Sequence, residues 1–242
     1  MCLKDKVALI TGGGGGIGRE TAIALSKAGA KVILFGGRKE LELQKTAELI
    51  DKNGGKCKFI AGDLTDLKIL SEVFDKVTLD EQKIDILINN AGVAHNTEFE
   101  KVTENQFDSI MKINVKVPYF LTQKALPLLR KSDGASIINI TSVVAHAGYE
   151  NQSVYTASKH ALLGFTKSLA TELHKEDIRV HAISPGGVYT DMIKVSRPDL
   201  TSDGMIMPKD IVDIIMFILT HRGNAVIDEI LVHRVGKIPF LV

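Results

Sequence analysis

Short apolar runs rich in β-branched residues alternate with longer segments of helical periodicity over almost the whole chain. Most of the short runs are continuously apolar, which is typical of parallel strands that are buried on both faces. The expected strands are KVALIT, KVILF, KCKFIAG, IDILINN, ASIINIT, IRVHAIS and VIDEILVHRV. The expected helices cover about residues 17–29, 39–53, 66–79, 103–131, 153–175 and 208–221. This alternation leaves few folds open, because parallel neighbours must be joined by long crossovers.

The alternation predicts an α/β fold with a doubly wound, Rossmann-type parallel sheet of about seven strands and helices on both faces. No linker, low-complexity tract or repeat interrupts the pattern, so residues 1–242 are expected to form a single domain. Pro127 is expected to kink the long helical segment at 103–131. In a sheet of this kind ligands bind beyond the carboxyl ends of the strands, and functional residues are expected there.

Composition argues against several classes of protein. The chain has 30 basic and 29 acidic residues and a formal net charge of +1, unlike the basic footprint of a nucleic-acid binder. Cys2 and Cys57 suggest neither a metal site nor a disulfide framework, and His146 and His181 are interpreted as surface or packing residues. The N-terminal apolar run is too short for a signal peptide, and no stretch is long enough to cross a bilayer. We expect a cytoplasmic, metal-free enzyme with a small-molecule substrate and no nucleic-acid or membrane partner.

A glycine-rich segment, LITGGGGGIGRE, follows the first expected strand and opens the first expected helix. Glycines permit a tight turn and let the backbone approach a pyrophosphate, whose charge meets the helix N-terminus. The alternative is a merely flexible turn. The position between a strand and a helix favours nucleotide binding.

Further motifs follow the glycine turn in order. They are Thr11-Gly12-x-x-x-Gly16-x-Gly18, Asp63 in AGDL, Asn89-Asn90-Ala91-Gly92, Asn114 in KINV, Ser142, Tyr155-x-x-x-Lys159, and Pro185-Gly186 with Thr190. This series resembles the short-chain dehydrogenase/reductase family from about residue 6 to about residue 222, and in particular its 3-oxoacyl-thioester reductases and general carbonyl reductases. The resemblance implies that one domain both binds a dinucleotide and carries out catalysis.

The resemblance also implies which residues contact the coenzyme. The glycines would line the pyrophosphate, the segment after the third strand would meet the adenine, and the segment after the sixth would hold the nicotinamide carboxamide. The implied coenzyme-binding residues are Gly12, Gly16, Ile17, Gly18, Asp63, Leu64, Asn90, Ala91, Gly92, Tyr155, Lys159, Pro185, Gly186, Val188 and Thr190.

Four residues are the candidate catalytic set. Carbonyl reduction needs a hydride donor and, opposite it, a proton donor, which the resemblance assigns to Tyr155. Lys159 lies four residues later on the same helical face, where its charge is expected to lower the pKa of Tyr155 from its usual value of about 10. Ser142 would hydrogen-bond the substrate oxygen, and Asn114 would position a water linked to the lysine.

Each of these residues also has an ordinary structural interpretation when taken alone. Tyr-x-x-x-Lys is common on exposed helices, Ser142 could cap a loop, and Asn114 could be an ordinary helical residue. The joint pattern favours catalysis. A non-catalytic dinucleotide sensor or scaffold is the main alternative, and an epimerase or dehydratase is disfavoured by the glycine spacing.

The end of the second strand bears on coenzyme choice. NAD-preferring proteins usually place an acidic residue there to bind the ribose 2′-hydroxyl. Here the strand is followed by Gly36-Gly37-Arg38-Lys39, and Arg38 can offer a planar fork to a 2′-phosphate. NADP is therefore the expected coenzyme, with NAD as the alternative, and Gly36→Asp is expected to shift preference toward NAD. The other interpretation is that both cations simply start a solvated helix.

The resemblance implies a homodimer or homotetramer, with the helices at 103–131 and 153–175 at a subunit contact. Many family members end in a glycine-containing stretch after the last strand. This chain ends in HRVGKIPFLV, with only Gly236 there, which leaves the tetramer contacts open.

Overall fold

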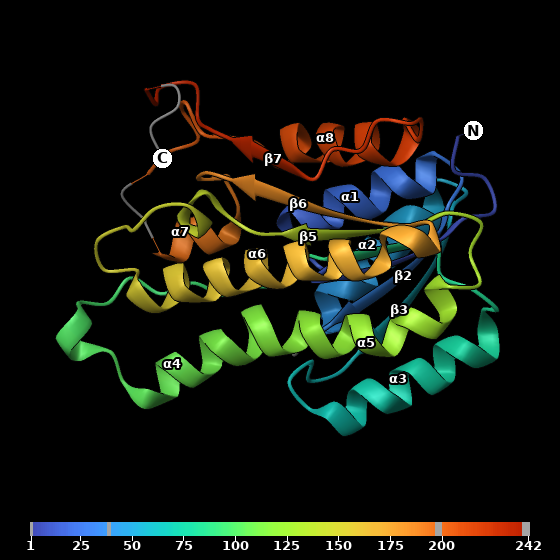
Figure 1. The fold of residues 1–242 in the computed structure, drawn as a ribbon, viewed down its shortest axis with the longest axis horizontal. Coiled ribbons are helices and arrows are strands. Elements are labelled where there is room, and N and C mark those ends of the chain that lie inside the picture. Colours follow the sequence, from blue (N-terminus) through green and yellow to red (C-terminus); the bar gives the residue numbers. More distant parts are fainter. Residues whose placement is uncertain (1, 38–39, 197–199, 239–242) are drawn as a thin grey trace.

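The computed structural model describes residues 2–37, 40–196 and 200–238 (Figure 1). Its strands are β1 (Val7–Thr11), β2 (Lys31–Gly36), β3 (Lys56–Ala61), β4 (Ile86–Asn89), β5 (Ala135–Ile140), β6 (Ile178–Pro185) and β7 (Glu229–Val232). Its α-helices are α1 (Gly16–Lys27), α2 (Glu40–Lys52), α3 (Leu67–Asp80), α4 (Glu104–Met111), α5 (Val117–Leu129), α6 (Ser153–Leu173), α7 (Asp191–Ser196) and α8 (Pro208–Thr220). Every expected strand forms, within a few residues of its expected ends.

The strands form one seven-stranded sheet in the order β3-β2-β1-β4-β5-β6-β7, and every neighbouring pair is parallel. The chain starts near the middle at β1, runs outward to β3, crosses to β4 and then runs outward to β7. The predicted doubly wound α/β fold is therefore confirmed. Beyond the carboxyl ends of β1 and β4 the winding reverses, and a crevice is expected at such a point.

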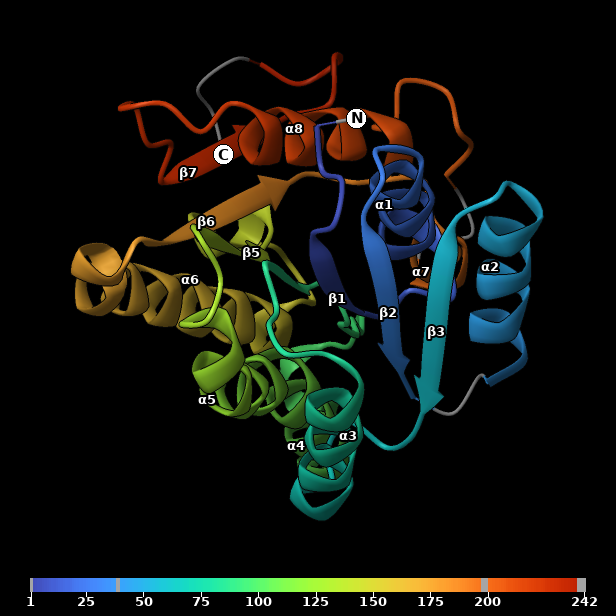
Figure 2. The same ribbon diagram turned by 90° about the vertical axis from the view of Figure 1, so that its right-hand side faces the viewer.

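Both faces of the sheet are covered by helices, which explains the continuously apolar strands. Successive residues of β1 alternate between the two layers, with Leu9 in one core and Ala8 and Ile10 in the other. Helices α3, α5 and α6 pack on the first face, and α1, α2 and α8 on the second (Figure 2).

The segment at 103–131 is not one kinked helix. It consists of α4, a π-helical turn at Lys112–Lys116, and α5. Pro127 lies inside α5, which continues past it to Leu129, so the irregularity lies at the π turn. The prediction located the break at the proline because a π turn leaves no comparable mark in the sequence.

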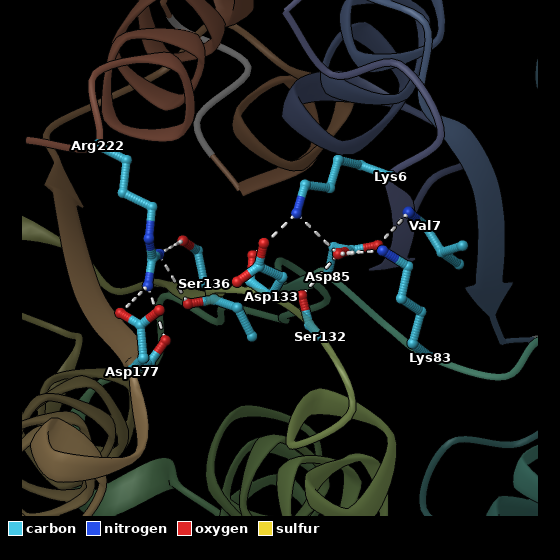
Figure 3. A network of polar contacts seen from close by, with 10 residues as sticks. Lys6, Val7, Lys83, Asp85, Ser132, Asp133, Ser136, Asp177 and Arg222 are labelled. Atoms are coloured by element: carbon cyan, nitrogen blue, oxygen red, sulfur yellow. Dashed lines mark hydrogen bonds and ion pairs between the residues drawn. The ribbon is translucent and has the colours of Figure 1, made fainter.

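The amino ends of the central strands are joined by a polar network around the buried carboxylate of Asp85 (Figure 3). Lys6 and Lys83 each donate to Oδ1 at 3.0 Å, Ser132 donates to the same atom at 2.6 Å, and the Val7 amide donates to Oδ2 at 2.9 Å. Burial raises the pKa of Asp85, but the hydrogen bonds outweigh burial and leave the pKa below its usual value. The network fixes the starts of β1, β4 and β5.

Arg222 forms further polar contacts along this edge, between the starts of β5 and β6. It donates to the carboxylate of Asp177 at 2.7 Å, to the Ala135 carbonyl at 3.0 Å and to the Ser136 hydroxyl at 3.2 Å (Figure 3). The amino edge of the sheet is thus held by ion pairs and hydrogen bonds, while the functional residues predicted from the motifs belong to the opposite, carboxyl edge.

Candidate active site

A cleft of about 1370 Å³ lies at the carboxyl edge of the sheet. Residues at or beyond the ends of all seven strands line it. They include residues 14–17, 36–37, 90–94, 140–144 and 185–188, Leu64, and His233, Arg234 and Lys237. The cleft therefore occupies the location that the doubly wound topology predicts.

The glycine turn forms one end of the cleft. Gly12 and Gly16 have φ values of +70° and +50°, in the left-handed region that side chains disfavour. A Cβ on Gly16 would lie 2.9 Å from the Thr190 methyl, and one on Gly18 would overlap the Gly12 carbonyl and the Asn90 amide. The turn therefore brings bare backbone to the cleft, while Gly18 itself packs behind the wall.

The turn is suited to an anionic group. Helix α1 begins at Gly16 behind Gly15, and no side chain caps its first amides. Uncapped amides at a helix start, next to a glycine backbone that a ligand can approach, form a ready site for a pyrophosphate. The residues present therefore fit the phosphates of a dinucleotide.

Asn90 and Thr11 fasten the segment after β4 to the end of β1. The Asn90 side chain donates to the Thr11 carbonyl at 2.9 Å, and the backbone amides of Asn90 and Ala91 both donate to the Thr11 hydroxyl at 3.0 Å. Asn90, Ala91 and Gly92 all line the cleft. The motif thus holds the two central strands together at the cleft wall.

An ion pair that the sequence did not predict lies behind the glycine turn. Arg19 donates to the Gly14 carbonyl and pairs with Glu42 at 2.7 Å, and Lys45 pairs with the other oxygen of Glu42 at 2.9 Å. These hydrogen bonds, from Lys45 first and then Arg19, lower the pKa of Glu42. Arg19 and Glu42 are 23 residues apart in sequence, so no local spacing could have revealed their pairing.

The end of β2 offers two glycines that differ in their surroundings. A Cβ on Gly36 would lie 2.9 Å from Leu43 Cδ2, whereas a Cβ on Gly37 would meet nothing within 4 Å. Both glycines line the cleft. The expected phosphate ligand Arg38 lies outside the described residues, as does Lys39.

The segment after β3 contributes one of its two expected residues to the cleft wall. Leu64 is buried and lines the cleft, but Asp63 is not part of the wall. The Asp63 carboxylate instead accepts hydrogen bonds from the amide of Thr65 at 2.9 Å and from its hydroxyl at 2.8 Å. Asp63 thereby shapes the turn that presents Leu64.

Ser142, Tyr155 and Lys159 converge at the middle of the cleft. Ser142 follows β5, its hydroxyl accepts from the Val144 amide at 3.3 Å, and it lies close enough to the Tyr155 phenol to influence the pKa of that phenol. Tyr155 lies in the first turn of α6, and Lys159 lies one turn further on. The Lys159 ammonium is 5.7 Å from the centroid of the Tyr155 ring and donates to the Ile140 carbonyl at 2.9 Å.

The pKa of Tyr155 departs from its usual value in the direction opposite to the one expected. Burial raises the pKa of the phenol, and the nearby Ser142 hydroxyl offsets this only in part. Burial also lowers the pKa of Lys159 to about 8. Desolvation therefore outweighs the expected effect of Lys159 on Tyr155, and it favours the neutral form of both side chains.

Asn114 lies in the π turn and is buried. Its side-chain oxygen accepts from the Val93 amide and its nitrogen donates to the Val93 carbonyl, both at 2.9 Å, and the nitrogen also donates to Ser158 at 3.0 Å. A Cβ on Gly92 would lie 3.3 Å from the Asn114 oxygen and 3.7 Å from the Lys159 ammonium. The asparagine thus ties the cleft wall after β4 to α6, beside Lys159.

The segment after β6 covers the far end of the cleft. The Gly186 amide donates to the Val232 carbonyl at 2.8 Å, Val188 pairs with Ile206, and the Thr190 methyl packs near Gly16. Pro185, Gly186, Val188 and Thr190 all line the cleft. Helix α7 follows directly and was not predicted, because its six residues are too few for a periodic pattern.

A chain of hydrogen bonds behind Ser142 was also missed. The Thr141 hydroxyl is bonded to the Ser184 hydroxyl, Ser184 donates to the Glu229 carboxylate, and His146 contacts the same oxygen at 2.6 Å. His146 is therefore not a simple surface residue. It links the segment after Ser142 to β7, across a separation of 83 residues.

The described residues contain neither a candidate membrane-spanning helix nor a candidate cluster of metal ligands. None of their helices has both the length and the apolar character needed to span a membrane. Within the same ranges, no three His, Cys, Asp or Glu residues are grouped so that they could hold a metal ion.

Comparison with known proteins gives consistent matches. Residues 6–201 match the family described as short chain dehydrogenase. The chain is 37% identical to General stress protein 39 of Bacillus subtilis over 200 residues, which is 82% of this chain and 69% of that protein. It is 32% identical to the 3-oxoacyl-acyl-carrier-protein reductase of Thermotoga maritima over 96% of this chain and 97% of that protein. A short chain dehydrogenase of Shigella flexneri, solved in complex with NADP, superposes with a TM-score of 0.89 at 29% identity, covering 96% of this chain and 98% of that one.

Proposed function

The chain belongs to the short-chain dehydrogenase/reductase family of NAD(P)-dependent oxidoreductases, and we propose that it interconverts ketones and secondary alcohols with NADP(H) as its coenzyme. The observation that carries the proposal is the convergence of Ser142, Tyr155 and Lys159 in the same cleft as the glycine turn.

In this proposal the Tyr155 phenol is the proton donor. Its raised pKa keeps the proton on the oxygen at neutral pH, which suits the reduction of a ketone. A nicotinamide bound in the cleft would supply the hydride to the carbonyl carbon. The carbonyl oxygen takes the Tyr155 proton as the carbon–oxygen double bond becomes single, and the phenolate is reprotonated from solvent.

The other three residues have supporting roles. The Ser142 hydroxyl and the Tyr155 phenol line the same cleft, so a substrate oxygen held by both hydroxyls would lie within reach of the proton. The Lys159 ammonium favours the phenolate left after proton transfer. Asn114 positions the segment after β4 beside Lys159 through its bonds to Val93 and Ser158.

Two features support NADP as the coenzyme. Neither Gly36 nor Gly37 presents a carboxylate that would repel a 2′-phosphate, and the nearby Glu42 is neutralised by Arg19 and Lys45. The Shigella flexneri relative was solved with NADP. NAD remains the alternative coenzyme.

We also propose the domain organisation, cellular location and assembly of the protein. Residues 1–242 form a single dinucleotide-binding and catalytic domain, which acts in the cytoplasm as a homodimer or homotetramer. The similarity to a 3-oxoacyl-acyl-carrier-protein reductase supports a carbonyl group as the site of reduction.

The test is a panel of ketones and secondary alcohols, followed by NADPH absorbance, with NADH run alongside. We expect turnover of at least one ketone, and Tyr155→Phe should lower it by about 10²–10⁴-fold while NADPH still binds, because the change deletes one proton donor and little volume. Lys159→Ala should impair both binding and turnover. Near-normal rates for Tyr155→Phe would refute the role of Tyr155, and tight NADPH binding without turnover of any substrate would favour the sensor alternative.

A further inference from the structure

The segment that follows β7 brings basic side chains to the cleft. His233, Arg234 and Lys237 all line it, together with Tyr155. The pairing of the Gly186 amide with the Val232 carbonyl fixes the start of the segment, and a Cβ on Gly187 would lie 3.7 Å from Arg234 Cδ. Arg234 therefore lies beside the wall formed by residues 185–188.

Arg234 has an unusual contact for an arginine. It is partly buried, and its Nη1 donates to the thioether sulfur of Met205 at 3.2 Å. A thioether is a weak acceptor, whereas a guanidinium carries five donors suited to a carboxylate or phosphate. Arg19, Arg130 and Arg222 each pair with a carboxylate, but no ion pair joins Arg234 to a carboxylate of the described residues.

A backbone turn places Lys237 close to Arg234 in the cleft lining. The Lys237 amide donates to the Arg234 carbonyl at 3.0 Å, which closes a turn of four residues. Asp191 also lines the cleft, but its carboxylate is 84% exposed and pairs with Lys194 at 3.2 Å. The local charge facing this part of the cleft is therefore positive.

We propose that the substrate carries an anionic group, and that Arg234, assisted by Lys237, binds this group while the carbonyl faces Tyr155. This inference rests on the proposed function and specifies its substrate class, namely ketones that bear a carboxylate or phosphate. A partly buried guanidinium with a sulfur acceptor has most of its donors available for such a group.

The test compares matched substrates on the purified enzyme with NADPH. A series of straight-chain oxo carboxylic acids, with increasing distance between ketone and carboxylate, is paired with the methyl esters of the same acids. Dihydroxyacetone phosphate is paired with dihydroxyacetone to separate phosphate from carboxylate recognition. We expect kcat/KM for at least one acid or for the phosphate to exceed that of its neutral partner by about tenfold or more, as a charge-assisted hydrogen bond allows.

Arg234→Gln should reduce this ratio by about tenfold, mainly through KM, and Arg234→Lys should retain part of it because one charge remains. Arg130→Gln is the matched control. It makes the same substitution at an exposed ion pair outside the cleft, and it should keep the ratio. The affinity for NADPH, measured by fluorescence, should be the same in wild type and Arg234→Gln.

Three results would overturn the inference. They are an anion-to-neutral ratio near one in the wild type, a ratio that Arg234→Gln leaves unchanged, and a loss of NADPH affinity in Arg234→Gln that accounts for the whole effect. Reduction of neutral ketones in any of these cases would leave the proposed function standing. Failure to reduce any ketone would refute the proposed function and this inference together.

Discussion

Lys159 donates a hydrogen bond to the carbonyl of Ile140 at 2.9 Å, and from that position its ammonium lies 5.7 Å from the ring centroid of Tyr155. The last residue of β5 therefore anchors the lysine. Lys159 is buried and Tyr155 is partly buried, so desolvation dominates their proton affinities, lowering the pKa of Lys159 and raising that of Tyr155.

The pH dependence of reduction should report this arrangement. The pKa of Lys159 is about 8, so its positive charge is present below that pH and is lost above it, well before an exposed lysine would lose its charge. We expect kcat/KM for ketone reduction to fall above about pH 8. The Lys159→Arg variant should have a lower rate, but its kcat/KM should start to fall at a higher pH than in the wild type, because a guanidinium keeps its charge. A wild-type profile that is flat to pH 10 would contradict the assignment.

Coenzyme preference should respond to a substitution at Gly37 with less steric conflict than to the Gly36→Asp substitution that the sequence suggested. A side chain on Gly36 would meet Leu43, whereas one on Gly37 has open space at the cleft wall. Gly37→Asp should therefore shift the ratio of kcat/KM from NADPH toward NADH by at least about tenfold, by repelling the 2′-phosphate. Gly37→Asn is the control of equal size without charge. The prediction is wrong if both variants shift the ratio equally.

Asp85 should contribute strongly to stability. Asp85→Asn removes the charge that holds Lys6 and Lys83 and disturbs the bond to the Val7 amide, at an expected cost of about 2 kcal/mol in urea unfolding. Asp80→Asn makes the same change in the exposed pair with Lys58 and should cost less than about 1 kcal/mol.

The Asp85 contribution should also depend on pH in a definite direction. The pKa of Asp85 is lowered in the folded protein, so its stabilisation is fully present above the unfolded value of about 3.9 and is lost as the pH falls through the folded value. The stability difference between wild type and Asp85→Asn should thus shrink in acid below about pH 4. A difference that is constant from neutral pH into acid would exclude this origin.

Self-association is expected through the helices that follow β4 and β5. Phe107 on α4 and Tyr119 on α5 are each 46% exposed, and Tyr119 packs on Phe165 of α6 with ring centroids 4.9 Å apart. Light scattering should give at least a dimer at micromolar concentration, and Phe107→Glu should weaken it. Leu79→Glu, at a more exposed position on α3, is the control and should leave the mass unchanged. A monomeric wild type would contradict the proposal.

The sequence predicts regular structure and motif order well, because both are encoded locally. All seven strands and the long helices follow from apolar periodicity, and the motif residues lie at strand ends. Contacts between distant residues could not be predicted in this way, among them Arg19 with Glu42 and His146 with Glu229. The predicted direction of the Tyr155 pKa shift was also wrong, because sequence spacing identifies the nearby cation but gives no measure of desolvation.

The position of β7 after the other six strands in the sequence has a consequence for biosynthesis. The glycine turn, Ser142, Tyr155 and Lys159 are all translated before the strand that supplies Glu229 and leads into Arg234. Folding during synthesis proceeds from the N-terminus, so the dinucleotide end of the cleft can form while its basic rim is still inside the ribosome. In terms of the roles proposed above, a nascent chain would acquire its coenzyme-binding residues before it acquired the residue proposed to discriminate among substrates.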